Sequence, residues 1–182
     1  MRRIVAGEFI SVDGVVEEPG EWSIKYFTPE VGAEIGKNMQ TSDAMLMGRV
    51  QYEQWSEYWP DKTDADDPFA GYINNVRKYV VSSSLDSVSW NNSVLIDGTA
   101  AAKEIAELKA QPGKDIVISG SISLMESLLR EGLIDELQLI MYPVVVGSGR
   151  RLFQESGGTI PLRLVETKPL GDGPVLLTYA RA

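Results

Sequence analysis

Residues 116–137, IVISGSISLMESLLREGLIDEL, begin as a β-branched run, break at Ser119-Gly120-Ser121 and continue with the apolar spacing of a helix. The first part predicts a buried strand over 116–118, and the last part predicts a helix over 122–131. Small residues between a strand and a helix allow a ligand to approach the helix N-terminus, whose backbone amides can bind an anion. The stretch therefore predicts an α/β fold, and it leaves open whether the turn binds a phosphate or only connects two elements.

Strands alternate with helices over about the first 130 residues, and the rest of the chain is predicted to form strands separated by Gly and Pro turns. Alternation predicts a parallel sheet covered by helices on both faces, whereas consecutive strands predict an antiparallel hairpin. We expect one α/β domain over residues 1–182, with three layers (α/β/α) and a mostly parallel central sheet that ends in a C-terminal hairpin at one edge. The other expected strands are 3–12, 44–47, 78–82, 93–96, 135–146, 160–168 and 174–181, and the other expected helices begin at Pro29 or span 49–58, 68–75 and 98–111.

The composition excludes several classes of function. The chain has no Cys and no His, which excludes disulfides, thiol catalysis, Ser-His-Asp triads and the usual zinc sites. The net charge of −9 and the lack of a Lys/Arg cluster argue against nucleic-acid binding. Residues 61–67, DKTDADD, lack the spacing of a calcium loop, so we expect an exposed acidic loop and no metal site. We find no signal peptide and no apolar stretch near the ~20 residues of a membrane span, and we expect a cytoplasmic protein.

Two further strand ends carry residues suited to phosphate binding. Gly48 permits close backbone approach, and Arg49 offers a planar guanidinium that can bind a phosphate or pair with a nearby acid. Ser82, Ser83 and Ser84 follow the next strand, where their hydroxyls can bind a phosphate or simply form a polar exit from the strand. Because ligands of open parallel sheets bind at the carboxyl ends of strands, these segments are candidate walls of one cleft.

In their order along the chain and in their residue types, these segments resemble the dihydrofolate reductase superfamily. The resemblance is closer to the reductase domain of bacterial riboflavin-biosynthesis deaminase–reductases and to its small stand-alone relatives. It implies a dihydrofolate reductase-like fold over nearly the whole chain, and NADPH as the cofactor. The matching segments are SVDG at 11–14, DAMLMGRVQYE at 43–53, VVSSSL at 80–85, the stretch at 116–137 and YPVVVGSGRRLF at 142–153.

The resemblance also implies a role for each residue of the cleft. Arg49 and the serines at 82–84 would hold the 2′-phosphate, and Gly48 would let the backbone approach the pyrophosphate. The amides of residues 120–122 would bind the pyrophosphate from the other side, while residues 118 and 119 would line the nicotinamide end. The implied cofactor-binding residues are thus Gly48, Arg49, Ser82, Ser83, Ser84, Ile118, Ser119, Gly120, Ser121 and Ile122.

Asp13 is the candidate catalytic residue and the first candidate for substrate binding. At the end of the first strand it would face the substrate as a hydrogen-bond acceptor or proton relay, or it would only form a turn with Gly14. Trp22 and Tyr52 are candidates for the wall of the substrate pocket, with ordinary core packing as the alternative. Neither Glu30 nor Glu34 matches the carboxylate that binds the pterin in dihydrofolate reductases, so dihydrofolate is not the expected substrate.

The leading hypothesis is an NADPH-dependent reductase that transfers a hydride to a small heterocyclic or carbonyl-like substrate, as riboflavin-pathway or dihydrofolate reductases do. Two alternatives stay open: a non-catalytic nucleotide- or flavin-binding module, and a dimeric scaffold with a vestigial pocket. The apolar tail strands at 137–146 and 175–179 suggest pairing across a two-fold axis, and the resemblance also implies a homodimer.

Overall fold

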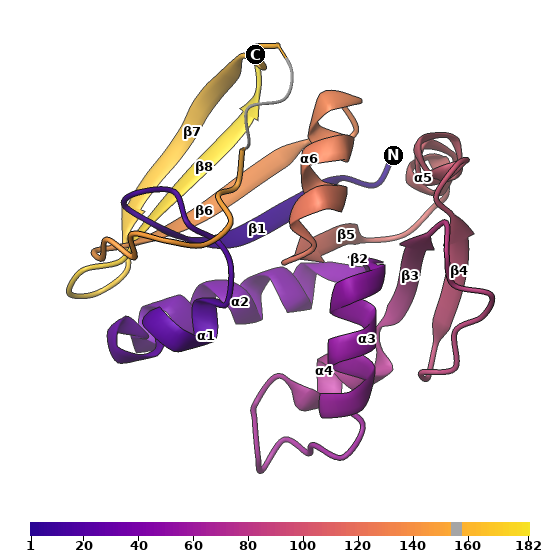
Figure 1. Ribbon diagram of the computed structural model, residues 1–182, viewed down its shortest axis with the longest axis horizontal. Helices are drawn as coiled ribbons and strands as arrows, with labels where there is room; N and C mark the ends of the chain where they lie inside the picture. Colours follow the sequence, from indigo (N-terminus) through magenta and orange to yellow (C-terminus); the bar gives the residue numbers. More distant parts are fainter. Residues whose placement is uncertain (154–157) are drawn as a thin grey trace.

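The computed structural model describes residues 1–153 and 158–182. Within these residues, eight strands form one sheet in the order β4-β3-β2-β5-β1-β6-β8-β7 (Figure 1). The strands are β1 (Ile4–Ser11), β2 (Ser42–Gly48), β3 (Arg77–Ser82), β4 (Ser93–Asp97), β5 (Asp115–Ser119), β6 (Glu136–Tyr142), β7 (Leu162–Pro169) and β8 (Val175–Arg181). The helices are α1 (Pro19–Trp22), α2 (Pro29–Thr41), α3 (Arg49–Tyr58), α4 (Ala70–Asn75), α5 (Ala101–Ala110) and α6 (Ile122–Arg130), with one 3-10 turn, η1 (Ile24–Tyr26).

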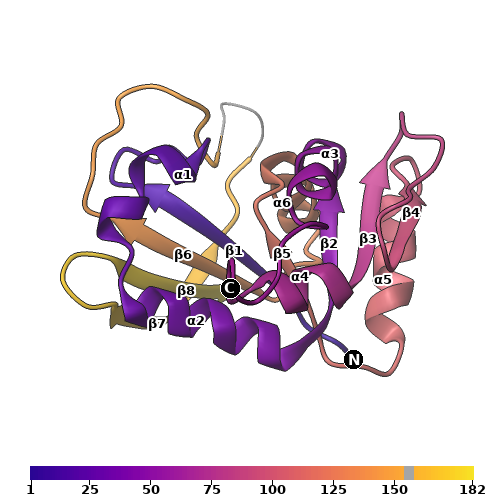
Figure 2. The same ribbon diagram turned by 90° about the horizontal axis from the view of Figure 1, so that it is seen from below.

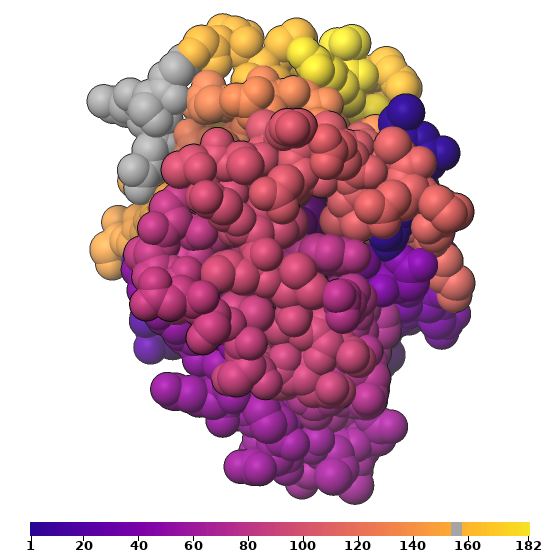
Figure 3. Space-filling view, turned by 90° about the vertical axis from the view of Figure 1, so that its right-hand side faces the viewer, coloured from indigo at the N-terminus to yellow at the C-terminus, as the bar shows by residue number. Residues whose placement is uncertain are grey.

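Every pairing from β4 to β6 is parallel, and the pairings of β6 with β8 and of β8 with β7 are antiparallel. The parallel strands therefore end at one common edge, from which α3, α5 and α6 continue the chain. The expected mostly parallel sheet with a C-terminal antiparallel hairpin at one edge is confirmed. Figure 3 views the molecule from the β4 end, which is covered by the segment from β3 to α5.

The pleat of β2 shows how the strands divide the core. Ala44 and Leu46 pack in a cluster with residues of α5 and α6, whereas Met45 and Met47 pack in a second cluster with residues of α3 and α4. A third cluster joins α2 to β6 and β8, and Figure 2 shows α2 running alongside these strands. Helices thus cover both faces of the sheet, as the three-layer prediction requires.

The expected boundaries agree with the structure to within two residues, except in three places. The helix expected from 98 begins at Ala101, because residues 98–100 form the turn out of β4. The strand expected over 135–146 ends at Tyr142, and the chain then crosses the end of β1, where Val12 N donates to Val144 O at 2.9 Å. The segment between the first expected strand and α2, for which no helix was expected, contains two short turns of helix, α1 and η1. At the start of α2, Thr28 Oγ1 accepts from Val31 N at 3.3 Å and Pro29 is the first helical residue, as predicted.

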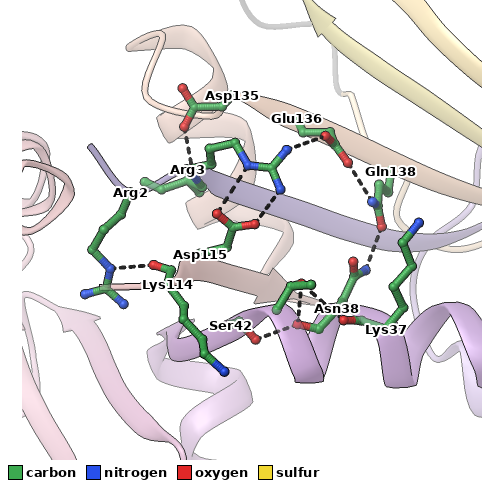
Figure 4. A network of polar contacts seen from close by, with 12 residues as sticks. Arg2, Arg3, Lys37, Asn38, Ser42, Lys114, Asp115, Asp135, Glu136 and Gln138 are labelled. Carbon is green, nitrogen blue, oxygen red and sulfur yellow. Dashed lines mark hydrogen bonds and ion pairs between the residues drawn. The ribbon is translucent and has the colours of Figure 1, made fainter. Parts of the chain in front are cut away.

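A polar network ties the strands together at the amino end of β1 (Figure 4). Arg3 binds Asp115 of β5 and Glu136 of β6. Glu136 accepts from Gln138 Nε2 at 2.7 Å, and Gln138 Oε1 accepts from Asn38 of α2 at 2.6 Å. These contacts connect β5, β6 and α2 through side chains.

None of the helices described is long and apolar enough to cross a membrane.

Candidate functional site

A cavity of about 1040 Å³ opens along the carboxyl edge of the parallel strands. It is assembled by the sheet order, because segments far apart in sequence leave neighbouring strands at the same edge. The strands that line it are marked by Gly98 after β4, Ser82 and Ser83 at the end of β3, Gly48 at the end of β2, Gly120 after β5 and Glu8 within β1. The three segments predicted to form one cleft therefore do lie together.

The centre of this cavity is formed by the N-termini of α3 and α6. Among residues 1–153 and 158–182, no side chain caps the first amides of either helix, although both helix starts line the cavity. The hydroxyl of Ser121, the residue before α6, accepts instead from Gly48 N at 2.8 Å. Two helix N-termini with uncapped amides are suited to bind an anion, because the amides and the helix dipoles both favour negative charge.

Gln51 fixes the two helix starts relative to each other. Its amide group donates to Ser119 O at the end of β5 and accepts from the Ser121 hydroxyl. The side chain is buried and lines the cavity. The sequence suggested no role for Gln51, because its partners lie about 70 residues away.

Two glycines bring backbone to the cavity surface. Gly120 has a φ of +77°, and a Cβ atom there would lie 3.1 Å from Gln51 Nε2. A Cβ atom on Gly48 would lie 3.6 Å from Ser121 Oγ. Gly120 is therefore required by its backbone conformation and its close contact, whereas Gly48 is in ordinary van der Waals distance of its neighbour.

Arg49 lines the cavity from the first turn of α3, and its guanidinium is paired with Glu53 one turn later at 2.7 Å. Both side chains are nearly half exposed, so the pair is screened by water and contributes little to stability. The structure thus contains the intrahelical ion pair that was the alternative to phosphate binding. A surface pair of this kind can exchange its carboxylate for a phosphate at low cost.

The serines at 82–84 differ in their position relative to the cavity. Ser82 and Ser83 line the cavity, but Ser84 is outside the part of the lining that the structure describes. Ser82 Oγ accepts from the amides of Ser84 and Leu85, both at 3.1 Å, and so shapes the turn. Of the two serines that line the cavity, Ser82 is buried and Ser83 is exposed.

The structure does not support Asp13 as a proton relay. Its carboxylate accepts from the Ser11 hydroxyl at 2.7 Å and from the amides of Val146 and Gly147 at 3.0 and 2.9 Å. These hydrogen bonds, the one from Ser11 first, lower the pKa of Asp13 to about 2, so it carries no proton to donate at neutral pH. Asp13 also does not belong to the described lining of the cavity. It anchors the loop after β6 to the end of β1.

The positions of Trp22 and Tyr52 are likewise explained by packing contacts. Trp22 Nε1 donates to Glu17 O at 2.9 Å, and its ring meets Tyr142 edge-on with centroids 5.8 Å apart. Tyr52 is 6 % exposed, and its hydroxyl accepts from the amides of Ser89 and Trp90 at 2.8 and 3.2 Å. Neither contributes to the lining formed by the described residues. The core-packing alternative considered for both residues describes their positions.

A second part of the cavity lies against α2, where polar residues without a predicted role reach the lining. Glu34 is buried, binds Lys168 and lies 3.7 Å from Lys37 Nζ. The hydrogen bond to Glu34 is the main cause of a raised pKa for Lys168. Asn38 and Gln138 line the same region and are oriented by the network of Arg3 and Glu136 (Figure 4). From the sequence, Glu34 did not match the pterin-binding carboxylate of dihydrofolate reductases, but the structure places it in the cavity lining.

The turn after β4 was also overlooked. Gly98 and Thr99 line the cavity, and Gly98 N donates to Ser82 O at 3.0 Å. Gly98 lies between a strand and a helix, as Gly48 does. This arrangement is the sequence feature that could have identified the turn as part of the site. Gly98 and Thr99 extend the cavity to the β4 end of the sheet.

The comparisons with known proteins agree with this architecture. The family model described as RibD C-terminal domain matches residues 2–176. YyaP, an uncharacterized protein of Bacillus subtilis (strain 168), is 31% identical over 181 residues, covering 98% of this chain and 94% of YyaP. A candidate riboflavin biosynthesis protein from Shewanella sp. PV-4 superposes with a TM-score of 0.79 at 21% identity and covers 99% of both chains. Dihydrofolate reductase from Enterococcus faecalis, solved with NADP(H), superposes with a TM-score of 0.63 at 16% identity, covering 98% of this chain and 96% of the other. The chain belongs to the RibD C-terminal domain family of dihydrofolate reductase-like proteins.

Proposed function

We propose that the protein is an NADPH-dependent reductase of a small heterocyclic or carbonyl-like substrate. The observation that carries the proposal is the pair of uncapped helix N-termini, α3 and α6, at the centre of one cavity. Such a pair suits the pyrophosphate of a dinucleotide, which carries negative charge and many acceptor oxygens. Family membership supports the same activity.

The dimensions of the cavity suit an extended dinucleotide. Its lining reaches from the end of β4 to Gln138 and Ile140 of β6, which is five strand spacings or about 24 Å. Gly48, Gly120 and Ser121 would hold the pyrophosphate in the middle. Arg49 and Ser83 would hold the 2′-phosphate on the β3 side, and Ser119 would lie at the nicotinamide end. The dihydrofolate reductase of E. faecalis, with its bound NADP(H), supports a dinucleotide in this fold.

The region against α2 would bind the substrate. Glu34, Asn38 and Gln138 provide carboxylate and amide groups beside the apolar residues Ile35 and Met39. This mixture suits a small flat molecule with polar edges, such as a heterocycle. When bound, the cofactor would supply the hydride; the residues of the chain would orient the substrate and exclude water.

Ligand-dependent melting tests the proposal directly. NADPH at about 100 times its dissociation constant should stabilise the protein by roughly 2.7 kcal/mol, which raises the melting midpoint by about 5–10 °C. NADH and flavin are the matched comparison ligands. The absence of any rise with NADPH would contradict both the reductase and an NADPH-binding module.

A second measurement separates catalysis from binding. NADPH oxidation is followed by absorbance with a panel of pterins, quinones and ketones. Oxidation with at least one substrate is expected of a reductase. A rise in melting midpoint without oxidation across the panel would instead favour the non-catalytic nucleotide-binding module.

A further inference from the structure

The half of the cavity that lies against α2 has an apolar floor, which is formed by one face of the sheet. In the pairing register, Val5 of β1 lies beside Val117 of β5, and Val117 lies beside Met45 of β2. Paired neighbours point to the same face, so these three side chains form a continuous strip, and all three line the cavity. Two residues further along β1, Gly7 lies beside Gln138 of β6 and adds no side chain. A flat ring can therefore lie on this floor next to Gln138.

A row of hydrogen-bonded polar residues borders the floor (Figure 4). Asn38 Nδ2 of α2 donates to Gln138 Oε1 at 2.6 Å. Asn38 O accepts from Ser42 Oγ at 2.6 Å, and Ser42 Oγ lies 2.6 Å from the hydroxyl of Tyr72 on α4. Glu34 precedes Asn38 by one helical turn, so the two side chains are neighbours. One small ligand can therefore reach the cavity-lining members of this row, which are Glu34, Asn38, Tyr72 and Gln138.

The direction of the hydrogen bonds makes the oxygen of Tyr72 an acceptor toward a ligand. A serine hydroxyl has one proton, and Ser42 donates it to the backbone carbonyl of Asn38, which can only accept. The bond between Tyr72 and Ser42 must then use the proton of Tyr72. Burial raises the pKa of Tyr72, so the phenol keeps this proton at neutral pH. The lone pairs of the Tyr72 oxygen are what this residue can offer to a ligand.

The amide of Asn38 is oriented in the same sense. Gln138 Nε2 donates to Glu136 Oε1 at 2.7 Å, which directs Gln138 Oε1 to accept from Asn38 Nδ2. Asn38 is thus held through its nitrogen, and its side-chain oxygen can accept from a ligand.

Glu34 adds a carboxylate, which only accepts hydrogen bonds when it is ionised. It is buried, it binds Lys168 of β7, and its Oε2 lies 3.7 Å from Lys37 Nζ. Because 3.7 Å is too long for a hydrogen bond, Oε2 can still accept from a ligand. Neither lysine belongs to the described lining of the cavity. The polar row therefore presents mainly acceptors.

The cations of the cavity lie elsewhere. In the described lining they are Arg49 and Arg150. Arg49 is in the first turn of α3, and Arg150 Nη2 donates to Ser123 Oγ in the first turn of α6 at 2.9 Å. Both therefore lie at the helix starts that are assigned to the phosphates of the cofactor. Residues 154–157, which are QESG and lie outside the described part of the chain, contain neither Lys nor Arg.

We propose that the α2 half of the cavity selects an uncharged, flat ring substrate that carries N–H or O–H donors and no phosphate or carboxylate. Such a ring can pair its donors with Glu34, Asn38 and Tyr72 while its face covers the apolar floor. An anionic group would meet these acceptors in place of a cation, and its desolvation would not be offset. The inference rests on the proposed function and names the class of its substrate.

Two pairs of ligands, each differing in one group, test the proposal. 6-Hydroxymethylpterin is compared with pterin-6-carboxylate, and pyridoxine is compared with its 5′-phosphate. Each ligand is titrated calorimetrically into the full chain, with and without saturating NADP⁺. The uncharged member of each pair should bind at least about tenfold more tightly, because a buried unpaired charge costs more than one hydrogen bond. Equal or tighter binding of the anionic members, or no binding of either uncharged ligand, would overturn the proposal.

A cation placed in the row should change this preference. Asn38→Lys should bind pterin-6-carboxylate about tenfold more tightly than the wild type does, because the new ammonium group pairs with the carboxylate. Gln40→Lys is the matched control, since Gln40 is an exposed residue of the same helix outside the described lining. It adds the same charge and should bind both pterins as the wild type does. Thermal melting verifies that both variants fold. An unchanged preference in Asn38→Lys would show that the pterins do not bind against α2.

Tyr72→Phe removes one acceptor and keeps the ring. It should weaken 6-hydroxymethylpterin by about three- to tenfold and leave the affinity for NADPH within about twofold of the wild type. Tyr58→Phe, an exposed tyrosine of α3 outside the described lining, should change neither affinity. An equal loss for both ligands in Tyr72→Phe would show that Tyr72 acts through the fold, and would contradict its role as an acceptor.

The outcomes also separate this inference from the proposed function. If the wild type does not bind NADPH, the proposed function fails, and the titrations without NADP⁺ still test the selection against charge. If NADPH binds but the anionic ligands bind as tightly as the uncharged ones, only the substrate class is wrong.

Discussion

At the scale of single residues, Arg49 has two competing partners. Without a phosphate it pairs with Glu53 on the surface of α3. A charge-assisted hydrogen bond to a phosphate contributes roughly 1.5–3 kcal/mol, more than an exposed intrahelical pair. We therefore propose that Arg49 serves selectivity between cofactors more than stability.

Replacement of Arg49 tests this role. Arg49→Ala should weaken NADPH by about 10- to 100-fold and leave NADH nearly unchanged, because only NADPH carries the 2′-phosphate. Calorimetric titration with each cofactor gives the two ratios. Glu53→Gln removes the competing carboxylate and should keep the preference for NADPH. Equal losses for the two cofactors in Arg49→Ala would show that the 2′-phosphate binds elsewhere.

Asp13 and Glu8 show that residue type alone does not determine the protonation state of a carboxyl group. Asp13 and Glu8 lie on the same strand and its following turn, and both were visible in the sequence. Asp13 is surrounded by donors that keep it ionised, whereas Glu8 is buried without a partner among the described residues. The pKa of Asp13 is lowered first by the Ser11 hydroxyl and then by the amides of the loop after β6, whereas burial raises the pKa of Glu8.

At the scale of elements, the turn between β5 and α6 depends on one glycine. Gly120 has a positive φ, and Gln51 packs where its side chain would be. The turn also supplies the uncapped start of α6. The turn therefore requires both the left-handed backbone conformation of Gly120 and the space beside it that Gln51 of α3 occupies.

Gly120→Val should destabilise the protein and interfere with the cofactor. The left-handed conformation disfavours a β-branched residue by about 1–3 kcal/mol, and the new side chain would displace Gln51. We expect a lower melting midpoint and loss of the additional stabilisation by NADPH, both measured by thermal melting. Gly36→Val is the matched control, because a Cβ atom there meets nothing within 4 Å. A Gly120→Val protein that NADPH stabilises as it does the wild type would refute the role of this turn.

At the scale of the whole molecule, the sheet determines where a second copy can pair. The tail strands expected to pair between subunits, β6 and β8, have neighbours on both sides within the chain. The last strand of the sheet is β7, which is exposed along most of its length, with Leu164 and Val165 each about half exposed. An edge strand presents unpaired backbone N–H and C=O groups, which can pair with a strand of another chain.

We therefore propose that the protein is a homodimer that pairs through β7. The wild type should sediment as a dimer, and Val165→Lys should shift it toward the monomer because charge on an edge strand opposes pairing. Sedimentation velocity at several concentrations measures both. Ile24→Lys changes another exposed apolar residue, far from β7 in sequence, and should leave the dimer intact. A monomeric wild type would contradict the proposal.

The sequence by itself determined the alternation of strands and helices, the antiparallel end of the sheet and the three strand ends that line the cavity. These features depend on local periodicity and on turn residues such as Gly48 and Gly120, which act through their own backbone. Only the tertiary structure decided which polar groups serve the site. Gln51, Glu34 and Glu8 acquire their positions from partners or burial created by segments distant in the chain, and Asp13 loses its predicted role for the same reason. Burial and hydrogen bonding are properties of the packed molecule. They determine the protonation state of a side chain and the groups that it can contact.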